Sequence, residues 1–253
     1  MDAGVRSPLI DFFRRGEVAG DVRLLAAQGA LAPRAHEQLA LLLLLVDDAD
    51  LTIAQTAAAT LDRLPPQSIS RFIARKDVPP QMLEFFTARG IDPDPGVAPD
   101  DDQPLVDTAS EGGADDAAAA EPQVLSSLPI IDRMKLAMRG SREQRSQLIR
   151  DSNKLVAVAV LSSPKLNESE VENFARMANV TEDVLRIIGS NRAWVKNYNI
   201  VSALTKNPKT PTALAMNFLQ RLNERDLKRL ATDRNVAEPV RLAAKKFVSK
   251  ALR

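Results

Sequence analysis

Hydrophobic residues in the C-terminal half of the chain recur every 13 residues. When the sequence is divided at Asn153, Leu166 and Asn179, a valine stands five residues after each division and a large apolar residue eight residues after it. These positions are Val158, Val171, Val184, Leu161, Phe174 and Ile187. The pattern resumes at Lys209, Leu222 and Asn235, followed five residues later by Leu214, Leu227 and Val240. An α-helix turns about 100° per residue, so a 13-residue step would place successive apolar residues about 220° apart on one helix. The pattern therefore predicts a series of separate short helices.

The residues between these apolar segments favour turns and helix starts. Thr181 is expected to be an N-cap, because Glu182 and Asp183 follow it in a first turn, where the helix dipole favours acidic side chains. Pro211 and Pro239 suit a first helical turn, because the missing N–H of proline needs no partner there. Each unit then comprises roughly nine helical residues and a tight turn.

Helices this short are not stable alone in water. Stacked on their neighbours, they can merge their apolar stripes into one continuous core, with two helices in each repeat of roughly 26 residues. The expected fold class is therefore all-α, specifically an α-solenoid of short helices with a ~13-residue helical unit.

A weaker form of the same pattern lies in the N-terminal part of the chain. Divisions at Leu51, Leu64 and Asp77 are 13 residues apart. The apolar positions that follow are Ile69, Met82, Phe72 and Phe85, whereas Thr56 breaks the pattern after the first division. Residues 35–46 are predicted to form a longer buried helix. We therefore expect two related helical modules, and no β-sheet in residues 1–90.

The 13-residue pattern has one irregularity, where four extra residues fall between positions 192 and 199. An insertion in a helical repeat often projects from the binding face. This one holds the only tryptophan and the only tyrosine of the chain. The candidate partner-binding residues are Arg192, Trp194, Lys196 and Tyr198. If the segment is helical, the two aromatic residues share a face, as a partner anchor or as packing in the core.

Charge divides the chain into three parts. Residues 91–123 carry ten acidic residues, no basic residue, and many proline, glycine and alanine residues, which predicts a disordered acidic linker. Residues 1–90 hold 10 basic and 11 acidic residues, whereas residues 124–253 hold 24 and 12. The predicted domains are therefore a nearly neutral module (1–90), the linker (91–123) and a basic module (124–253). The linker could screen the basic module from polyanions, most strongly at low salt.

The last helices are rich in basic residues. We define the basic patch as Lys228, Arg229, Arg234, Arg241, Lys245 and Lys246. These side chains could bind the phosphates of a nucleic acid. Alternatively, they form the polar outer face that the final repeat of a solenoid needs.

The sequence predicts no catalytic, cofactor-binding or metal site. The chain has no cysteine and one histidine, His36, and no glycine-rich phosphate loop is present. Asp47, Asp48 and Asp50 lack the glycine turn and the distal glutamate of a calcium loop, so they are interpreted as a helix end. Alternate glutamates at positions 168, 170 and 172 do not share a helix face and are interpreted as exposed surface. We therefore do not expect an enzyme.

The chain is expected to reside in the cytoplasm. Its longest apolar run spans only the eight residues 39–46, whereas a membrane span needs about 20. The N-terminal residues lack the basic-then-apolar order of a signal peptide.

The short units resemble a known repeat family. Their starts follow the pattern N-V-x-E-x-V, as at 179–184 and 235–240, and this resembles the leucine-rich repeat variant family and, with shorter units, HEAT-like repeats. The resemblance implies a right-handed superhelix. Some members of that family carry an iron–sulfur cluster in a cysteine-rich segment, which a chain without cysteine cannot hold. Two stretches, LIRDSNKLVAVAVLSSP and NRAWVKNYNIVSALTKNPKTP, also resemble a group of uncharacterised bacterial proteins.

These observations favour a non-enzymatic module that binds another protein or acts as a scaffold. The alternative is a nucleic-acid-associated protein that binds phosphates through the basic C-terminal module. Neither interpretation requires a membrane, a cofactor or a small-molecule substrate.

Overall fold

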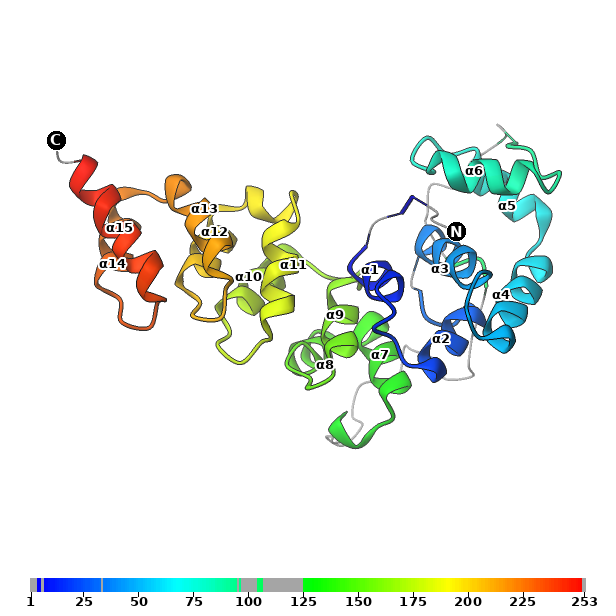
Figure 1. The fold of residues 1–253 in the computed structure, drawn as a ribbon, viewed down its shortest axis with the longest axis horizontal. Helices are drawn as coiled ribbons and strands as arrows, with labels where there is room; N and C mark the ends of the chain where they lie inside the picture. Colours follow the sequence, from blue (N-terminus) through cyan, green and yellow to red (C-terminus); the bar gives the residue numbers. More distant parts are fainter. Residues whose placement is uncertain are drawn as a thin grey trace. The chain divides into compact units, whose positions relative to one another are not determined.

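The computed structural model describes residues 4–5, 7–32, 34–94, 96, 104–106 and 125–251, and the side chains of these residues as far as position 249. The described residues form helices and connecting turns, with no β-strand among them. The chain divides into two compact units, Met1–Arg139 and Gly140–Arg253, each of which can be followed in Figure 1. The prediction of an all-α fold is therefore confirmed for the described part of the chain.

The first unit is built around a leucine-rich helix. Its helices are α1 (Pro8–Arg14), α2 (Gly20–Ala27), α3 (Ala35–Leu45), α4 (Leu51–Arg63), α5 (Pro66–Ile73), α6 (Pro80–Thr87), the short 3₁₀ helix η1 (Leu125–Ser127) and α7 (Ile130–Arg139). Helix α3 packs against α1, α2 and α4, and nine of its 11 residues are buried. The predicted buried helix at 35–46 is confirmed, with Val46 as its C-cap.

Prolines start α5 and α6, as the sequence predicts. Pro66 and Pro80 are the first residues of these helices. One predicted core position is wrong by one residue, because α6 buries Phe86 and leaves Phe85 half-buried. The Phe85 ring lies instead under the guanidinium group of Arg89, 4.1 Å from its centroid. A cation above the ring face stabilises an aromatic side chain that stays partly in water.

The start of the predicted acidic linker packs onto the first unit. The backbone N–H of Asp94 donates to the carbonyl oxygen of Ser70 at 3.2 Å, and the Ser70 hydroxyl donates to the carbonyl oxygen of Asp92. Most of the predicted linker, 91–123, lies outside the described residues, so its disorder stays a prediction.

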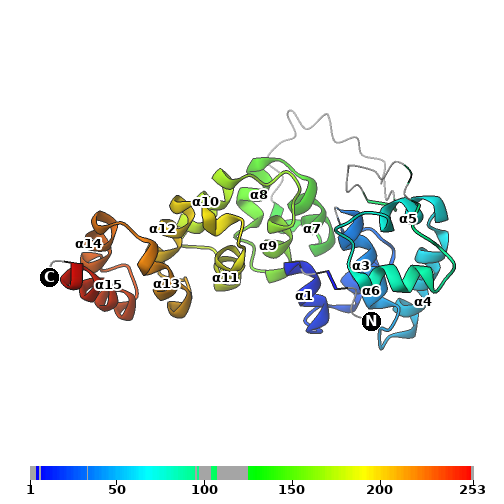
Figure 2. The same cartoon turned by 90° about the horizontal axis from the view of Figure 1, so that it is seen from above.

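The second unit is a series of short helices joined by tight turns. They are α8 (Arg142–Leu148), α9 (Lys154–Leu161), α10 (Glu168–Arg176), α11 (Glu182–Ser190), η2 (Trp194–Lys196), α12 (Tyr198–Lys206), α13 (Thr212–Phe218), η3 (Leu219–Arg221), α14 (Glu224–Thr232) and α15 (Glu238–Ala251). Helix α9 packs on α11, α10 on α12, α13 on α15, and α14 on α15. Two views of the ribbon, in Figures 1 and 2, show these helices following one another within the unit. The predicted succession of short helices is confirmed.

Buried residues occupy matching places in successive helices of this unit. They are Val171, Phe174 and Ala175 in α10, Val201, Leu204 and Thr205 in α12, and Leu227, Leu230 and Ala231 in α14. The step from the α10 set to the α12 set is 30 residues, and the next step is 26. The four extra residues of the first step coincide with η2, where the sequence pattern is interrupted.

Asparagine is the main capping residue of these helices. Asn153, Asn167, Asn197 and Asn223 are N-caps whose side chains accept a hydrogen bond from a backbone N–H of the first turn. Thr181 is the N-cap of α11, as predicted, but its side chain makes no capping hydrogen bond. Pro211 is the N-cap of α13, one position before the predicted first turn. None of the described helices is long and apolar enough to cross a membrane.

Candidate interaction surface of the second unit

A buried ion pair joins α8 to α10. Nε and Nη2 of Arg145 donate to Oε1 of Glu170 at 3.1 and 2.9 Å, and Nη2 also lies 3.0 Å from Oε2. Only 4% of Arg145 and 2% of Glu170 is exposed. Nη1 of Arg145 donates to the carbonyl oxygen of Gly140 at 2.9 Å, so its charge is well satisfied inside the unit.

Glu170 also takes part in the cap of its own helix. Its Oε2 accepts from the backbone N–H of Asn167 at 3.3 Å, while the Asn167 side chain accepts from the Glu170 N–H at 2.9 Å. Together with the bonds from Arg145, this capping box gives both carboxylate oxygens of Glu170 hydrogen-bond donors. The prediction that Glu170 lies at the exposed surface is wrong, because Arg145 provides a buried cation for it. The sequence contained one sign of this pair. Arg145 stands 26 residues before Val171, at a position where α10, α12 and α14 have a buried apolar residue.

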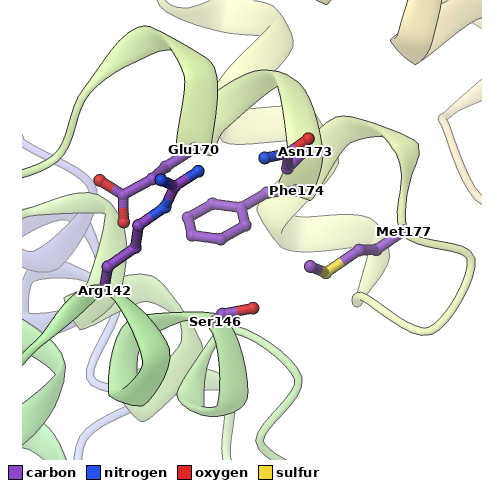
Figure 3. A pocket seen from close by; sticks show the side chains of 6 residues that line it. All are labelled: Arg142, Ser146, Glu170, Asn173, Phe174 and Met177. Carbon is purple, nitrogen blue, oxygen red and sulfur yellow. The ribbon is translucent and has the colours of Figure 1, made fainter.

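A hollow of about 290 Å³ opens beside this ion pair, between α8 and α10. Its lining residues are Arg142, Ser146, Glu170, Asn173, Phe174 and Met177. Figure 3 shows the Phe174 ring at the centre of the hollow, with Ser146 on α8 across from it. Phe174 is almost fully buried, whereas Arg142 and Asn173 are exposed at the rim. The hollow thus combines an apolar floor with polar and basic edges.

A second hollow of about 250 Å³ lies between α10 and α12. Its lining residues are Arg176, Asn199, Ser202, Ala203, Lys206, Asn207 and Pro208. Asn207 connects the two helices, because its Nδ2 donates to the carbonyl oxygens of Ala175 at 2.8 Å and Met177 at 2.9 Å. These bonds satisfy backbone groups at the C-terminal end of α10, which would otherwise lack partners.

The two hollows use matching helix positions. Asn173 of α10 lines the first hollow, and Ala203 of α12, 30 residues later, lines the second. Met177 and Asn207 likewise occupy equivalent places at the ends of α10 and α12. Both hollows therefore open on the same side of the successive helices. We call the exposed surface of α8, α10 and α12 around the two hollows the first-helix face.

Basic side chains line this face. Arg142 borders the first hollow, and Arg176 and Lys206 border the second. Arg176 pairs with Glu172 one helical turn earlier, and 61% of its side chain remains exposed. Nζ of Lys206 lies 3.0 Å from Oδ1 of Asp226. The exposed Arg176–Glu172 pair contributes little to stability, so the Arg176 cation can exchange partners readily.

Polar contacts also join α12 to α14. The Tyr198 hydroxyl donates to Oδ2 of Asp226 at 2.6 Å and accepts from the backbone N–H of Asn223 at 3.2 Å. The Tyr198 hydroxyl, more than the Lys206 ammonium, lowers the pKa of the Asp226 carboxyl. Desolvation, followed by the bond to Asp226, raises the pKa of Tyr198. Both shifts keep the phenol neutral and the carboxylate charged.

The predicted partner-binding residues do not share one helix face. Trp194 and Lys196 belong to the short 3₁₀ helix η2, which ends at the extended residue Asn197, and Tyr198 then begins α12. The condition for a shared face, one continuous helix, is therefore not met, because the chain changes direction between the two aromatic residues. Trp194 is half-buried, while Arg192 and Lys196 are exposed. The role of all four residues in partner binding stays a prediction. The Tyr198 hydroxyl also joins α12 to α14.

The basic patch is spread over the last helix pair. Lys228 and Arg229 lie on α14, Arg234 lies in the following turn, and Arg241, Lys245 and Lys246 lie on α15. Within their own helices, Lys228 pairs with Glu224, and Arg241 lies 3.9 Å from Glu238. The patch therefore belongs to two helices and a turn, and two of its cations already have an acidic neighbour.

The remaining polar residues that the sequence singles out have structural positions. Asp48 accepts from Arg23 at 2.6 Å, and Asp50 is the N-cap of α4. His36 is half-buried in the first turn of α3. Within the described part of the chain, no three His, Asp or Glu side chains gather where they could hold a metal ion.

Comparison of the chain with protein-family models, curated proteins and solved structures gives no match.

Proposed function

We propose that this protein is a non-enzymatic interaction module, and that its second unit is a right-handed α-solenoid of helix pairs that binds an acidic protein segment on the first-helix face. The observation that carries the proposal is the presence of two hollows in register, between successive helices, with Arg142, Arg176 and Lys206 at their edges. The recurrence of buried residues at steps of 30 and 26 residues supports the solenoid.

The chemistry of the hollows favours binding over catalysis. Glu170 is the one carboxylate that lines them, and Arg145 and the Asn167 N–H already occupy both of its oxygens. A general base must be able to accept a proton from a substrate, and a carboxylate held in this way is poorly suited to that role. The other titratable lining residues are arginine and lysine.

A peptide fits the surface better than a nucleic acid does. The exposed amides of Asn173 and Asn199 and the half-buried hydroxyl of Ser146 can bond to a peptide backbone, and the cations can pair with acidic side chains. Single-stranded nucleic acid usually stacks its bases on exposed aromatic rings. Phe174 is the only aromatic residue that lines the hollows, and it is buried.

A second candidate function is nucleic-acid binding through the basic patch. The observation in its favour is charge, because residues 140–253 contain 21 basic and 11 acidic residues, a net charge of +10. A surplus of this size attracts phosphates without regard to sequence.

Binding assays on the full-length chain can separate the two candidates. A fluorescent oligoglutamate peptide, random duplex DNA and single-stranded RNA would each be titrated by anisotropy at low and at physiological salt. We expect saturable peptide binding that survives physiological salt, and nucleic-acid binding that falls steeply as salt rises. Nucleic-acid binding that persists at physiological salt, together with no peptide binding, would overturn the proposal in favour of the second candidate.

A further inference from the structure

A buried glutamine of the first unit holds a distant piece of the chain. Gln38 lies in α3 with only 1% of its surface exposed. Its Oε1 accepts from the consecutive backbone N–H groups of Leu105 and Val106, at 2.7 and 3.0 Å. Its Nε2 donates to the carbonyl oxygens of Gly29 at 2.7 Å and Val106 at 3.3 Å. The amide group of Gln38 is thus fully used by two separate segments.

A glycine makes the approach of this segment possible. Gly29 has a φ of +79° just after α2, a conformation that favours glycine. A Cβ atom at this position would lie only 2.8 Å from Cγ2 of Val106, and 2.9 Å from its Cβ. The positive φ and the lack of room for a Cβ atom therefore both favour glycine here. The lack of room is caused by Val106.

The contact also explains why a polar side chain is tolerated among the leucines of α3. Without residues 105 and 106, Oε1 of Gln38 would lose both of its donors inside the unit, and a buried acceptor without a partner is costly. The hydrogen bonds of the Gln38 amide all go to backbone groups, so they recognise the path of the backbone and not particular side chains. The Val106 side chain lies against Gly29, where any larger residue would collide with it.

We infer that Gln38 and Gly29 form a docking site for a bend of peptide that carries two adjacent aliphatic residues, and that the chain's own segment 104–106 occupies it. Leu105 and Val106 are the only two adjacent large aliphatic residues in the acidic stretch 91–123. The docked segment fastens this stretch to the first unit. A partner segment of the same chemistry would have to displace it. The site lies in the first unit, whereas the first-helix face belongs to the second.

Amide hydrogen exchange of the full-length protein, resolved by NMR, tests this site directly. In the wild-type chain, the Leu105 and Val106 amides should exchange at least about tenfold more slowly than in an unstructured peptide. Gln38→Leu removes the acceptor of both amides and places an apolar side chain in buried α3, so their exchange should return to the unstructured rate. Exchange at the unstructured rate in the wild-type chain would show that the site is empty and overturn the inference.

Two further variants keep the test meaningful if Gln38→Leu unfolds the first unit. Val106→Asp places a charge against Gly29 and should release the Leu105 amide, whereas Val97→Asp adds the same charge to the same acidic stretch and should leave it protected. Protection of the α3 amides in both variants shows that the unit is folded. The inference is wrong if both variants, or neither, accelerate exchange at Leu105.

Discussion

Arg145 of α8 and Glu170 of α10 form a bidentate ion pair inside the second unit, with 5% and 2% of their side chains exposed. The pair connects two successive helices beside the hollow that Phe174 lines. It stands where other helices of the unit place aliphatic residues, such as Ile200 and Val201 of α12. A buried ion pair is not by itself evidence of stability, because both charges lose their hydration.

Breaking this pair on one side should destabilise the second unit. Glu170→Gln keeps the shape and the cap of α10 but leaves the Arg145 charge uncompensated, so the free energy of unfolding should fall by about 3 kcal/mol. Trp194, the only tryptophan in the chain, reports on this unit in a fluorescence-monitored denaturation. The control replaces both residues by leucine, and its free energy of unfolding should lie within about 1 kcal/mol of the wild-type value. If the single variant is as stable as the wild type, the pair does not hold α8 to α10.

Asn207 should contribute more to stability than its neighbour Asn199. Asn207→Ala removes two hydrogen bonds and leaves the carbonyl oxygens of Ala175 and Met177 without this donor, at a cost of about 2 kcal/mol. Asn199 lines the same hollow but is exposed, so Asn199→Ala should change stability by less than about 0.5 kcal/mol. Equal effects of the two variants, measured by the same denaturation, would show that the bonds of Asn207 do not join the helices.

Tyr198 is expected to act through its hydroxyl group. Tyr198→Phe keeps the ring but removes the bond to Asp226, which should lower the free energy of unfolding by about 1.5 kcal/mol, since a hydrogen bond to a charged group is stronger than a neutral one. Binding of the oligoglutamate peptide should not change. Lost peptide binding with unchanged stability would instead make Tyr198 a contact residue.

The lowered pKa of Asp226 predicts loss of stability in acid. The folded pKa lies below the ordinary value of 3.8, so the charged carboxylate stabilises the folded state above that value. This contribution is lost as pH falls from about 5 through the folded pKa. Asp226→Asn should therefore flatten the acid limb of the stability curve followed through Trp194. An acid limb of unchanged steepness in this variant would contradict the assignment.

A second carboxylate in the same unit has to be removed from this comparison. The pKa of Glu143 is also lowered, mainly by the hydrogen bond from its own backbone amide and then by the Ser141 hydroxyl. The Asp226 comparison is therefore best made in a chain that carries Glu143→Gln, so that the Glu143 contribution to the acid limb is absent from both samples.

The helices of the second unit could be predicted from sequence because their signals are local. Periodic apolar residues such as Val171 and Phe174 define the buried side of each helix, and turn-forming residues separate the helices. The irregularity of the sequence pattern near position 194 coincides with the 3₁₀ helix η2, between α11 and α12. Local signals also have limits, as Phe85 shows: a shift of one residue changes which phenylalanine is buried, and only packing decides this.

The polar contacts between helices could not be predicted, because they join residues that are distant in sequence. Glu170 stands 25 residues from Arg145, and Asp226 stands 28 residues from Tyr198. A helical pattern places each glutamate or aspartate on a face but does not say which cation or hydroxyl meets it. The lining residues of the two hollows also come from helices that are distant in sequence, so the sequence contained no direct sign of the hollows.

The central claim is that the first-helix face binds an acidic segment, and a matched pair of charge reversals tests it most directly. Arg142→Glu with Arg176→Glu changes that face, whereas Arg229→Glu with Lys246→Glu makes the same change of charge in the basic patch. Affinity of the full-length protein for the oligoglutamate peptide should fall at least about tenfold in the first variant and less than about threefold in the second. Equal losses in both variants, or a loss confined to the second, would contradict the claim.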